Sequence, residues 1–116
     1  MTISLSNDQV RFLRLHAQRL TSQSPGGVTG VVEVVKQVCG IQAQEASAAT
    51  LAVRARSAGL VVADVDQARV QRRTIIRTWG PRGTLHLLAS DDIGWLLPLL
   101  GPVFVAGDRR RREESI

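Results

Sequence analysis

Apolar residues recur at helical spacing through the first half of the chain. Four of them form one face of a helix predicted over residues 7–19: Val10, Leu13, Ala17 and Leu20. Ser6 and Gln9 have the spacing of a capping box at the start of this helix. After a Pro-Gly-Gly breaker, a valine-rich stripe predicts a buried helix over residues 28–38, which packing must stabilise because valine is a poor helix former.

The link after this valine-rich helix holds the residues of greatest chemical interest. Gly40 has no Cβ and is predicted to take the left-handed position that ends the helix. The next helix begins near Glu45, so the link between the two is predicted to be extended. Side chains alternate in an extended segment, and Gln42 and Gln44 therefore point to one side while Ala43 points to the other. The pattern predicts a small polar platform that bears two amides.

Two more helices are predicted before the periodicity changes. An alanine-rich helix over residues 45–58 stops at Gly59, and its small side chains allow another backbone to approach closely. A shorter helix is predicted over residues 64–72, with Val65 and Ala68 facing inward and arginines in its last turn.

The hydrophobic period then changes from helical to alternating. Two strands are predicted, over residues 74–79 and 84–88, joined by a four-residue turn over residues 80–83. If this turn closes symmetrically, Trp79 pairs with Thr84 and Arg77 pairs with His86.

This register predicts which side chains share each face of the hairpin. The face packed on the helices would carry Ile76, Thr78, Leu85 and Leu87. The opposite face would present Arg77, Trp79 and His86.

The last part of the chain begins as a helix and has no closing element. Ser90 is predicted as its N-cap, with Asp91 and Asp92 in the first turn. The apolar stripe that follows consists of Ile93, Leu96, Leu97 and Leu100, and it should be kinked or interrupted by Pro98 and Pro102. We expect the charged run over residues 108–116 to continue into a longer protein.

The charge of the chain is basic and unevenly placed. The net charge is +5, and the stretch from Gln67 to Ser90 contains arginines but no acid. Its basic residues are Arg69, Arg72, Arg73, Arg77 and Arg82. Such a field suits a polyanion, because neutralising phosphates releases counterions. The alternative is that 14 Arg against one Lys reflects genomic base composition and that these side chains are simply solvated.

The cysteine count and the lengths of the apolar runs narrow the class of protein further. Cys39 is the single cysteine, so no internal disulfide forms, and a reducing cytoplasm is the simplest location. Charged residues break up the first twenty positions, and no apolar run approaches membrane-spanning length. Neither histidine lies near Cys39 at metal-ligand spacing. We therefore expect a cytoplasmic protein with no membrane segment, metal or cofactor.

Three helices, a basic stretch and a hairpin follow the order of a winged helix-turn-helix domain, so the predicted fold class is mainly α with a β-hairpin. Two motifs make the resemblance more specific: Gly40-Ile41-Gln42-Ala43-Gln44, and Arg77-Thr78-Trp79-Gly80-Pro81-Arg82-Gly83-Thr84-Leu85-His86. From about Val10 to Gly107 the chain resembles the winged helix DNA-binding domain family that includes the YcaQ/AlkZ-like crosslink-repair DNA glycosylases.

The resemblance implies a fold, a partner and a site. Members of this family surround a basic DNA channel with tandem winged helices, need no metal, and remove N7-alkylated purines, including those in interstrand crosslinks. Their catalytic motif is a glutamine, an aliphatic residue, and a second glutamine or an aspartate. On this chain it falls on Gln42 and Gln44, which is the first variant. The partner is double-stranded DNA, with contacts expected from Arg54, Arg72, Arg73, Arg77, Arg82 and His86.

Members of the family are longer than this chain. Residues 1–90 are therefore expected to form one winged helix domain, and residues 91–116 the start of a following helical segment that is cut before its end. The remaining winged helix domains would belong to a longer chain.

Two amides are suited to the hydrolysis of the glycosidic bond of an N7-alkylated purine. An N7-alkylpurine is already cationic and leaves without a general acid, whereas a neutral base needs a protonated leaving group. Two amides can orient a water and present carbonyl dipoles to an oxocarbenium-like sugar, although they are not strong bases. This predicts activity on alkylated purines and little on uracil.

Blander interpretations of the same residues remain open. The two glutamines can be a polar loop that caps the flanking helices, His86 can be a structural histidine, and Arg82 at the hairpin tip can be merely solvated. Three classes of function follow: a DNA glycosylase, a winged helix DNA binder without catalysis, or an interaction fragment that is inert alone.

Overall fold

The computed structural model of the protein describes residues 1–115, which form a mainly helical chain with a small three-stranded antiparallel sheet. The helices are α1 (Asn7–Ala17), α2 (Gly27–Gln37), α3 (Ala46–Ala55), α4 (Val62–Asp66), a π-helical turn η1 (Gln67–Gln71), a 3₁₀ turn η2 (Pro81–Gly83) and α5 (Ser90–Glu114). The strands are β1 (Ile41–Gln42), β2 (Ile75–Trp79) and β3 (Leu85–Ala89), arranged in the order β1-β3-β2. The predicted hairpin is therefore present, and the extended link after α2 adds a third strand to it.

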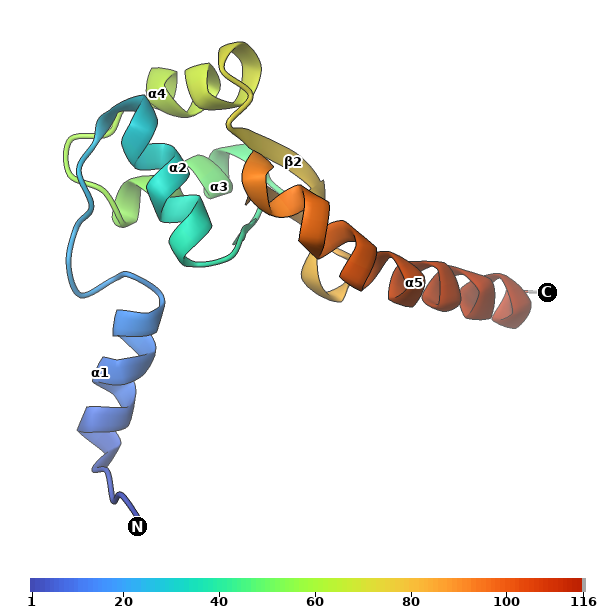
Figure 1. Cartoon of the computed structure of the whole chain (residues 1–116), viewed down its shortest axis with the longest axis horizontal. Coiled ribbons are helices and arrows are strands. Elements are labelled where there is room, and N and C mark those ends of the chain that lie inside the picture. The colour runs from blue at the N-terminus through green and yellow to red at the C-terminus, as the bar shows by residue number, and fades with distance from the viewer. Residues whose placement is uncertain (116) are drawn as a thin grey trace.

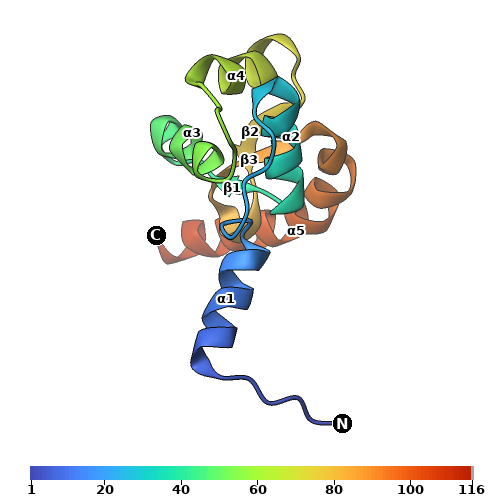
Figure 2. The same cartoon turned by 90° about the vertical axis from the view of Figure 1, so that its left-hand side faces the viewer.

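The core lies between one face of this sheet and the helices α2, α3 and η1. The valine stripe of α2 supplies its centre, with Val31, Val34 and Val35 fully buried. Ala49 and Val53 of α3 pack against the same cluster, as expected for an alanine-rich helix that approaches closely. In the view of Figure 2, α3 is drawn to the left of the strands and α2 to their right, and both helices contribute to the core on one face of the sheet.

Several predicted helix features are confirmed. The side chain of Ser6 accepts a hydrogen bond from the backbone N–H of Gln9 at 3.2 Å, and the Gln9 side chain accepts one from the Ser6 N–H at 2.8 Å, which is the capping box of α1. Val65 and Ala68 are buried at 3% and 0% exposure. The predicted helix over residues 64–72 is thus present, as α4 continued by η1.

The start of α5 differs slightly from the prediction. Ala89 holds the N-cap position, and the hydroxyl of Ser90 donates instead to the backbone oxygen of Arg73. Pro98 and Pro102 lie inside α5 without ending it. Both prolines are exposed, so water can satisfy the carbonyls that they leave unpaired.

The register predicted for the hairpin is wrong by one residue. Trp79 pairs with Leu85, and Thr78 pairs with His86. The loop has three residues rather than four, because Gly80 already belongs to the ladder and donates its N–H to Thr84 O at 2.9 Å. Left-handed backbone at Arg82, with φ 63°, and at Gly83, with φ 70°, turns the chain within this shorter loop.

The changed register redistributes side chains between the two faces of the sheet. Leu85 and Leu87 share a face with Arg77 and Trp79, while His86 moves to the face that holds Thr78 and Ile76. The predicted grouping of His86 with Arg77 is therefore also wrong.

Two helical arms leave the body of the molecule. Figure 1 shows α1 projecting away from the body at one end and the second half of α5 extending at the other. The radius of gyration is 16.7 Å, whereas a compact domain of this length has about 13 Å. No residue of α1 is buried. The body between the two arms holds the core and both predicted motifs.

Candidate functional site

The link between α2 and α3 begins with a tight helix stop. The N–H of Gly40 donates to Val35 O at 3.1 Å and that of Cys39 to Lys36 O at 3.2 Å, the pattern of a Schellman motif. Cys39, with φ 55°, takes the left-handed stop position that was predicted for Gly40. Gly40 follows with φ 114°, and a Cβ there would lie 2.8 Å from Leu88 Cδ2. Glycine is thus required by both the backbone and the packing.

The predicted alternation along the link is confirmed. Ile41 and Ala43 are buried at 5% and 0% exposure, whereas Gln42 and Gln44 are exposed. The two buried residues belong to the core cluster, so they fix which side of the strand faces inward. The two amides therefore lie on the opposite side, as an extended segment requires.

Arg77 and Gln44 hold the far end of β1 in place. Ala43 N donates to Leu85 O at 2.7 Å, but the return bond of this ladder pair is absent. Instead Ala43 O accepts from Arg77 Nε at 2.8 Å, and Leu85 N donates to the side-chain oxygen of Gln44 at 3.2 Å. A second bond runs from the Arg77 guanidinium to Gln44 O at 2.9 Å. This exchange of partners ends the strand and fixes the backbone beside Gln42.

Gln42 faces His86 across the strands β1 and β3. The neighbouring pair, Ala43 and Leu85, carries the ladder hydrogen bond, so Gln42 and His86 form a non-hydrogen-bonded pair. In this geometry the Cα atoms lie only about 4.5 Å apart and the side chains approach closely. Within residues 1–115 no hydrogen bond occupies the Gln42 amide, so it is open to a ligand.

A hollow of about 530 Å³ opens over this pair of residues, and we call it the Gln42 hollow. It is lined by Gln18, Val38, Cys39, Gly40, Ile41, Gln42, Ala52, Arg56, Pro81, Arg82 and His86. Its cations come from two separate elements, Arg56 at the end of α3 and Arg82 in the hairpin turn. The hollow therefore combines a free amide, a histidine ring and two guanidinium groups.

His86 is the most buried of the ionisable residues that line the Gln42 hollow. It is 5% exposed, and its Nδ1 lies 2.9 Å from Thr84 O. A Cβ on Gly80 would lie 2.9 Å from three atoms of His86, and a Cβ on Gly40 would lie 3.6 Å from its Cδ2. The two glycines thus make the space that the ring fills. The sequence pointed to Gly40 but did not reveal the role of Gly80.

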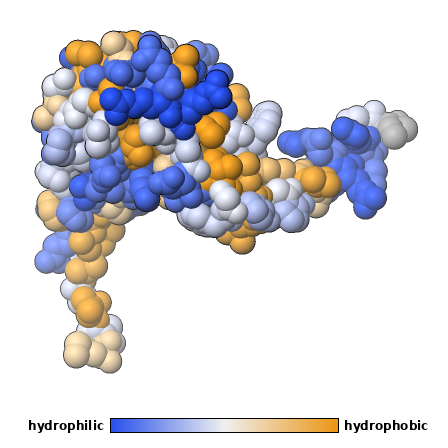
Figure 3. Space-filling model, turned by 45° about the horizontal axis from the view of Figure 1, so that its top comes forward, coloured by the Kyte–Doolittle hydropathy of each residue, from blue (hydrophilic) through white to orange (hydrophobic). Residues whose placement is uncertain are grey.

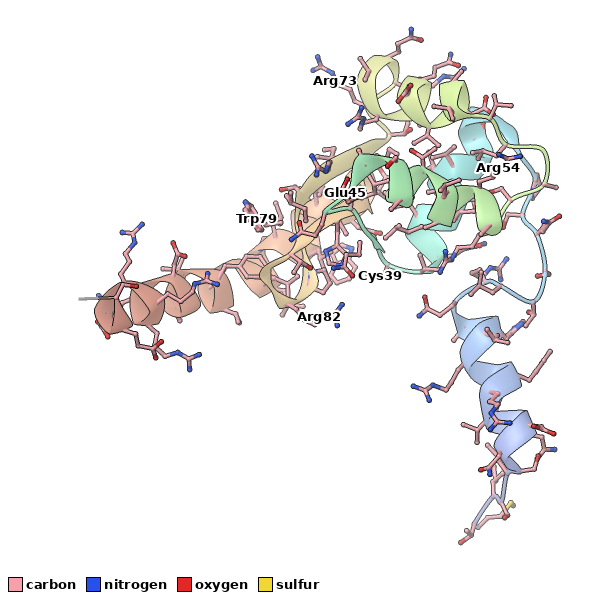
Figure 4. All side chains as sticks on the ribbon, turned by 180° about the vertical axis from the view of Figure 1, so that it is seen from behind. Cys39, Glu45, Arg54, Arg73, Trp79 and Arg82 are labelled. Atoms are coloured by element: carbon pink, nitrogen blue, oxygen red, sulfur yellow. The ribbon has the colours of Figure 1, made fainter. Side chains whose placement is uncertain are left out.

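The predicted DNA-contacting arginines are not gathered into one cluster. Figure 4 shows Arg54 on α3, Arg73 after η1 and Arg82 in the hairpin turn, at three separate places on the body. Arg72, Arg73 and Arg82 are exposed, and no ion pair to them is found within the described residues. Arg77 instead donates to the link, as described above.

Hydrophilic side chains cover a broad part of the molecule's surface. Figure 3 shows such an area over the end of the body that carries α4 and η1, and another over the last turns of α5. The arginines near α5's end are partly neutralised, because Arg111 and Arg112 both pair with Asp108. Most of the unpaired positive charge therefore belongs to the body rather than to this arm.

Sequence reasoning did not single out Arg56. Its Nε donates to Gln18 O and one NH group donates to Ala52 O, both at 2.8 Å. Partial burial lowers the pKa of the Arg56 guanidinium below its usual value, through desolvation. Arg56 thus fixes the end of α1 to α3 beside the Gln42 hollow. Only the alanine-rich pattern around it hinted at a close helix contact.

A smaller hollow lies on the other side of the link. Its volume is about 210 Å³, and it is lined by Ala43, Ala46, Ser47, Ala49, Thr50, Val62, Val65, Asp66, Arg69, Arg77 and Leu87. We call it the Ser47 hollow. Arg69 in this hollow lies 3.8 Å from Asp66, so part of its charge is compensated there. Neither glutamine of the link opens into it.

Two kinds of feature are absent from the part of the chain that the structure describes. No helix formed by residues 1–115 has the length and apolar character to cross a membrane. Over the same residues, no three His, Cys, Asp or Glu side chains gather as ligands of a metal ion would.

Comparison with known proteins places the link and the hairpin in one matched segment. Residues 35–115 match the model of the AlkZ-like family, described as DNA glycosylase AlkZ-like. The chain is also similar to an interstrand DNA cross-link repair glycosylase from Streptomyces sahachiroi, with 40% identity over 68 residues. That match covers 59% of this chain but only 18% of the relative. No solved structure matches the chain at a significant level.

Proposed function

This chain belongs to the AlkZ-like DNA glycosylase family, and from that premise we propose that it contributes the catalytic link of a glycosylase that excises N7-alkylated purines from duplex DNA. The observation that carries the proposal is the geometry of the link. Gln42 presents a free amide to the Gln42 hollow, on a strand whose end is fixed by Arg77 and Gln44. The fixed backbone directs the Gln42 side chain into the hollow, where its carbonyl dipole can be turned toward a developing positive charge.

The two amides have different roles in this proposal. Gln42 is free to accept a hydrogen bond from a water and to turn its carbonyl oxygen toward a positively charged sugar. The Gln44 oxygen is already bonded to Leu85 N, so Gln44 acts first on the backbone of the link and offers its NH₂ group to the substrate. Removing Gln42 should therefore affect the reaction alone. Removing Gln44 should affect both the reaction and stability.

The leaving group explains why no strong acid is needed. An N7-alkylated purine carries a positive charge before the glycosidic bond breaks, and it departs as a neutral base. The sugar left behind has oxocarbenium character, which carbonyl dipoles stabilise. The substrate class of the proposal is therefore a cationic purine, and an interstrand crosslink through N7 has the same chemistry.

We further propose that α2, α3 and the hairpin β2–β3 form a winged helix unit within residues 1–90, with residues 91–116 leading into another segment. The hairpin turn would be the wing that approaches the DNA backbone, since Arg82 at its tip is exposed. Exposed Arg54, Arg72 and Arg73 would add phosphate contacts from other elements. In this arrangement Arg77 supports the link rather than the duplex.

A second candidate function is DNA binding without catalysis. The bond between Gln44 and Leu85 N favours it, because an amide that caps a strand end needs no catalytic role. A binder of this kind would show a steep salt dependence and would be indifferent to Gln42 substitution.

The experiment that separates the two is release of 7-methylguanine from methylated duplex DNA by the natural full-length protein. Gln42→Ala should lower the single-turnover rate by about 10²–10³-fold, as the loss of one preorganised dipole does at comparable sites. Gln37→Ala is the matched control, since Gln37 is an exposed glutamine at the end of α2 outside the Gln42 hollow. Duplex binding without release in all three proteins would support the second candidate instead.

A further inference from the structure

The cross-strand partner of Gln42 is a group that can accept a proton, which an amide cannot. His86 lies opposite Gln42 in a non-hydrogen-bonded pair and lines the same hollow. Its position follows from the register of β3 between β1 and β2, with Thr78 on its other side. A water bound to the Gln42 amide in this hollow would therefore lie beside the imidazole ring.

The hydrogen bond at Nδ1 determines which ring nitrogen is available. Nδ1 lies 2.9 Å from Thr84 O, and a carbonyl oxygen can only accept, so Nδ1 carries the hydrogen. In the neutral ring Nε2 then holds a lone pair. Within the described residues, the hydrogen bonds of the His86 ring involve only Nδ1, so Nε2 has no partner. The fully buried side-chain atoms without a partner are Arg19 Nε and Ser24 Oγ, and His86 Nε2 is not among them. Nε2 therefore keeps contact with the solvent of the hollow.

The packing of the ring fixes where Nε2 points. Gly80 borders the ring at Nδ1, where a Cβ would come within 2.9 Å, and Gly40 borders it at Cδ2, where a Cβ would lie at 3.6 Å. A carbonyl that orients the far nitrogen of a histidine is the arrangement found where the ring serves as a base. A ring that only filled space would not need an open Nε2 in a polar hollow.

We propose that His86 is the proton acceptor for the attacking water, with Gln42 as the group that orients that water. This inference rests on the proposed function and names a further catalytic residue for it. The water oxygen bonds to C1′ of the sugar while the bond from C1′ to the purine nitrogen breaks. The electron pair of that bond goes to the purine and cancels its charge. The water proton goes to His86 Nε2 and then to solvent, which leaves an abasic site and a neutral alkylpurine.

The test is the single-turnover rate of 7-methylguanine release at saturating DNA by the natural full-length protein and its His86→Asn variant. Asparagine can donate its amide N–H to Thr84 O as Nδ1 does, but it has nothing in the place of Nε2. The rate should fall by about 10²–10⁴-fold, the usual worth of a positioned base. Duplex affinity and melting temperature should stay close to those of the unaltered protein.

A second variant gives a readout that a structural histidine would not produce. His86→Ala leaves a space between Gly40 and Gly80, and added imidazole should restore part of the lost rate by filling it. Release at the normal rate by His86→Asn would overturn the inference. So would a loss of rate in His86→Asn that is matched by a loss of duplex affinity and melting temperature.

The failure of this inference is distinguishable from failure of the proposed function. If His86→Asn is fully active while Gln42→Ala is not, the glycosylase stands and the proton goes directly to solvent. If neither the unaltered protein nor any variant releases 7-methylguanine, the glycosylase itself is wrong, and the role of His86 falls with it.

Discussion

The two faces of the three-stranded sheet have opposite characters. The face toward α2, α3 and η1 is filled by Ile41, Ala43, Ile75 and Leu87, none of which is more than 5% exposed. The opposite face carries Gln42, Thr78 and His86 toward the Gln42 hollow, of which Gln42 is exposed, and it continues into Ile76 and the buried Leu88. The same three strands thus provide the main core on one side and, over part of the other side, a polar candidate site.

The comparison shows how packing on one face of a small sheet determines which side chain the other face presents. Side chains alternate along β1, so the burial of Ile41 and Ala43 determines where Gln42 points. Packing on the hydrophobic face stabilises the fold, and it thereby sets the direction of the side chains on the polar face. Changes on the first face should therefore act on folding, and changes on the second should act on chemistry.

The sharpest test of this division is a pair of neighbouring isoleucines on opposite faces. Ile75→Ala should lower the free energy of unfolding by about 2–5 kcal/mol, because Ile75 is fully buried and its removal leaves a cavity. Ile76→Ala, at a residue 38% exposed, should cost clearly less. Urea unfolding of both variants measures the difference, and equal losses would contradict the assignment of the faces.

A methyl group at Gly80 tests the space around His86. Gly80→Ala should lower the free energy of unfolding by about 1–3 kcal/mol and also slow base release, because the new Cβ displaces the imidazole. Gly94→Ala is the control: nothing lies within 4 Å of a Cβ there, and the position is helical. It should be neutral or stabilising by up to about 1 kcal/mol. If Gly80→Ala behaves like the control, His86 is not confined as described.

Substitution of Arg77 tests whether its hydrogen bonds to Ala43 and Gln44 hold the link in place. Arg77→Ala should lower the free energy of unfolding by about 1–3 kcal/mol, because Ala43 O and Gln44 O lose their charged donor. Arg54→Ala is the matched control, since Arg54 is exposed on α3. Thermal unfolding compares the two variants. A cost at Arg77 no larger than at Arg54 would mean that the link does not depend on the guanidinium.

Arg82 should give the smallest effect on folding and a specific effect on DNA binding. Arg82→Ala should leave the melting temperature unchanged and reduce the slope of log affinity against log salt by about 1, as the loss of one phosphate contact does. Fluorescence anisotropy with duplex DNA at several salt concentrations measures the slope. Arg11→Ala, on α1 and paired with Asp8, is the control that should leave the slope unchanged.

Much of the local structure could be predicted from the sequence, and the reasons are physical. The capping box at Ser6, the valine stripe of α2 and the alternation around Ala43 each depend on neighbours within a few residues. The hairpin could not be placed as well. Its register depends on the left-handed backbone at Arg82, which a residue other than glycine rarely adopts and which the sequence therefore did not indicate.

The arrangement of the candidate site could be predicted only in part, because the sequence indicates its segment but not its internal contacts. The motif identified Gln42 and Gln44, and their common side follows from strand geometry. The pairing of Gln42 with His86 and the bonds from Arg77 to the link join segments more than 30 residues apart. Such contacts arise from tertiary packing, and no local pattern contains them.

The most direct test of the account is a crystal structure of the natural full-length protein bound to duplex DNA that contains an abasic site. The account predicts that the abasic sugar enters the Gln42 hollow, with C1′ facing the Gln42 amide and His86 Nε2. A sugar bound in the Ser47 hollow, beside Arg69 on the other side of the link, would contradict it. So would a duplex held by the arginines with its sugar far from both glutamines.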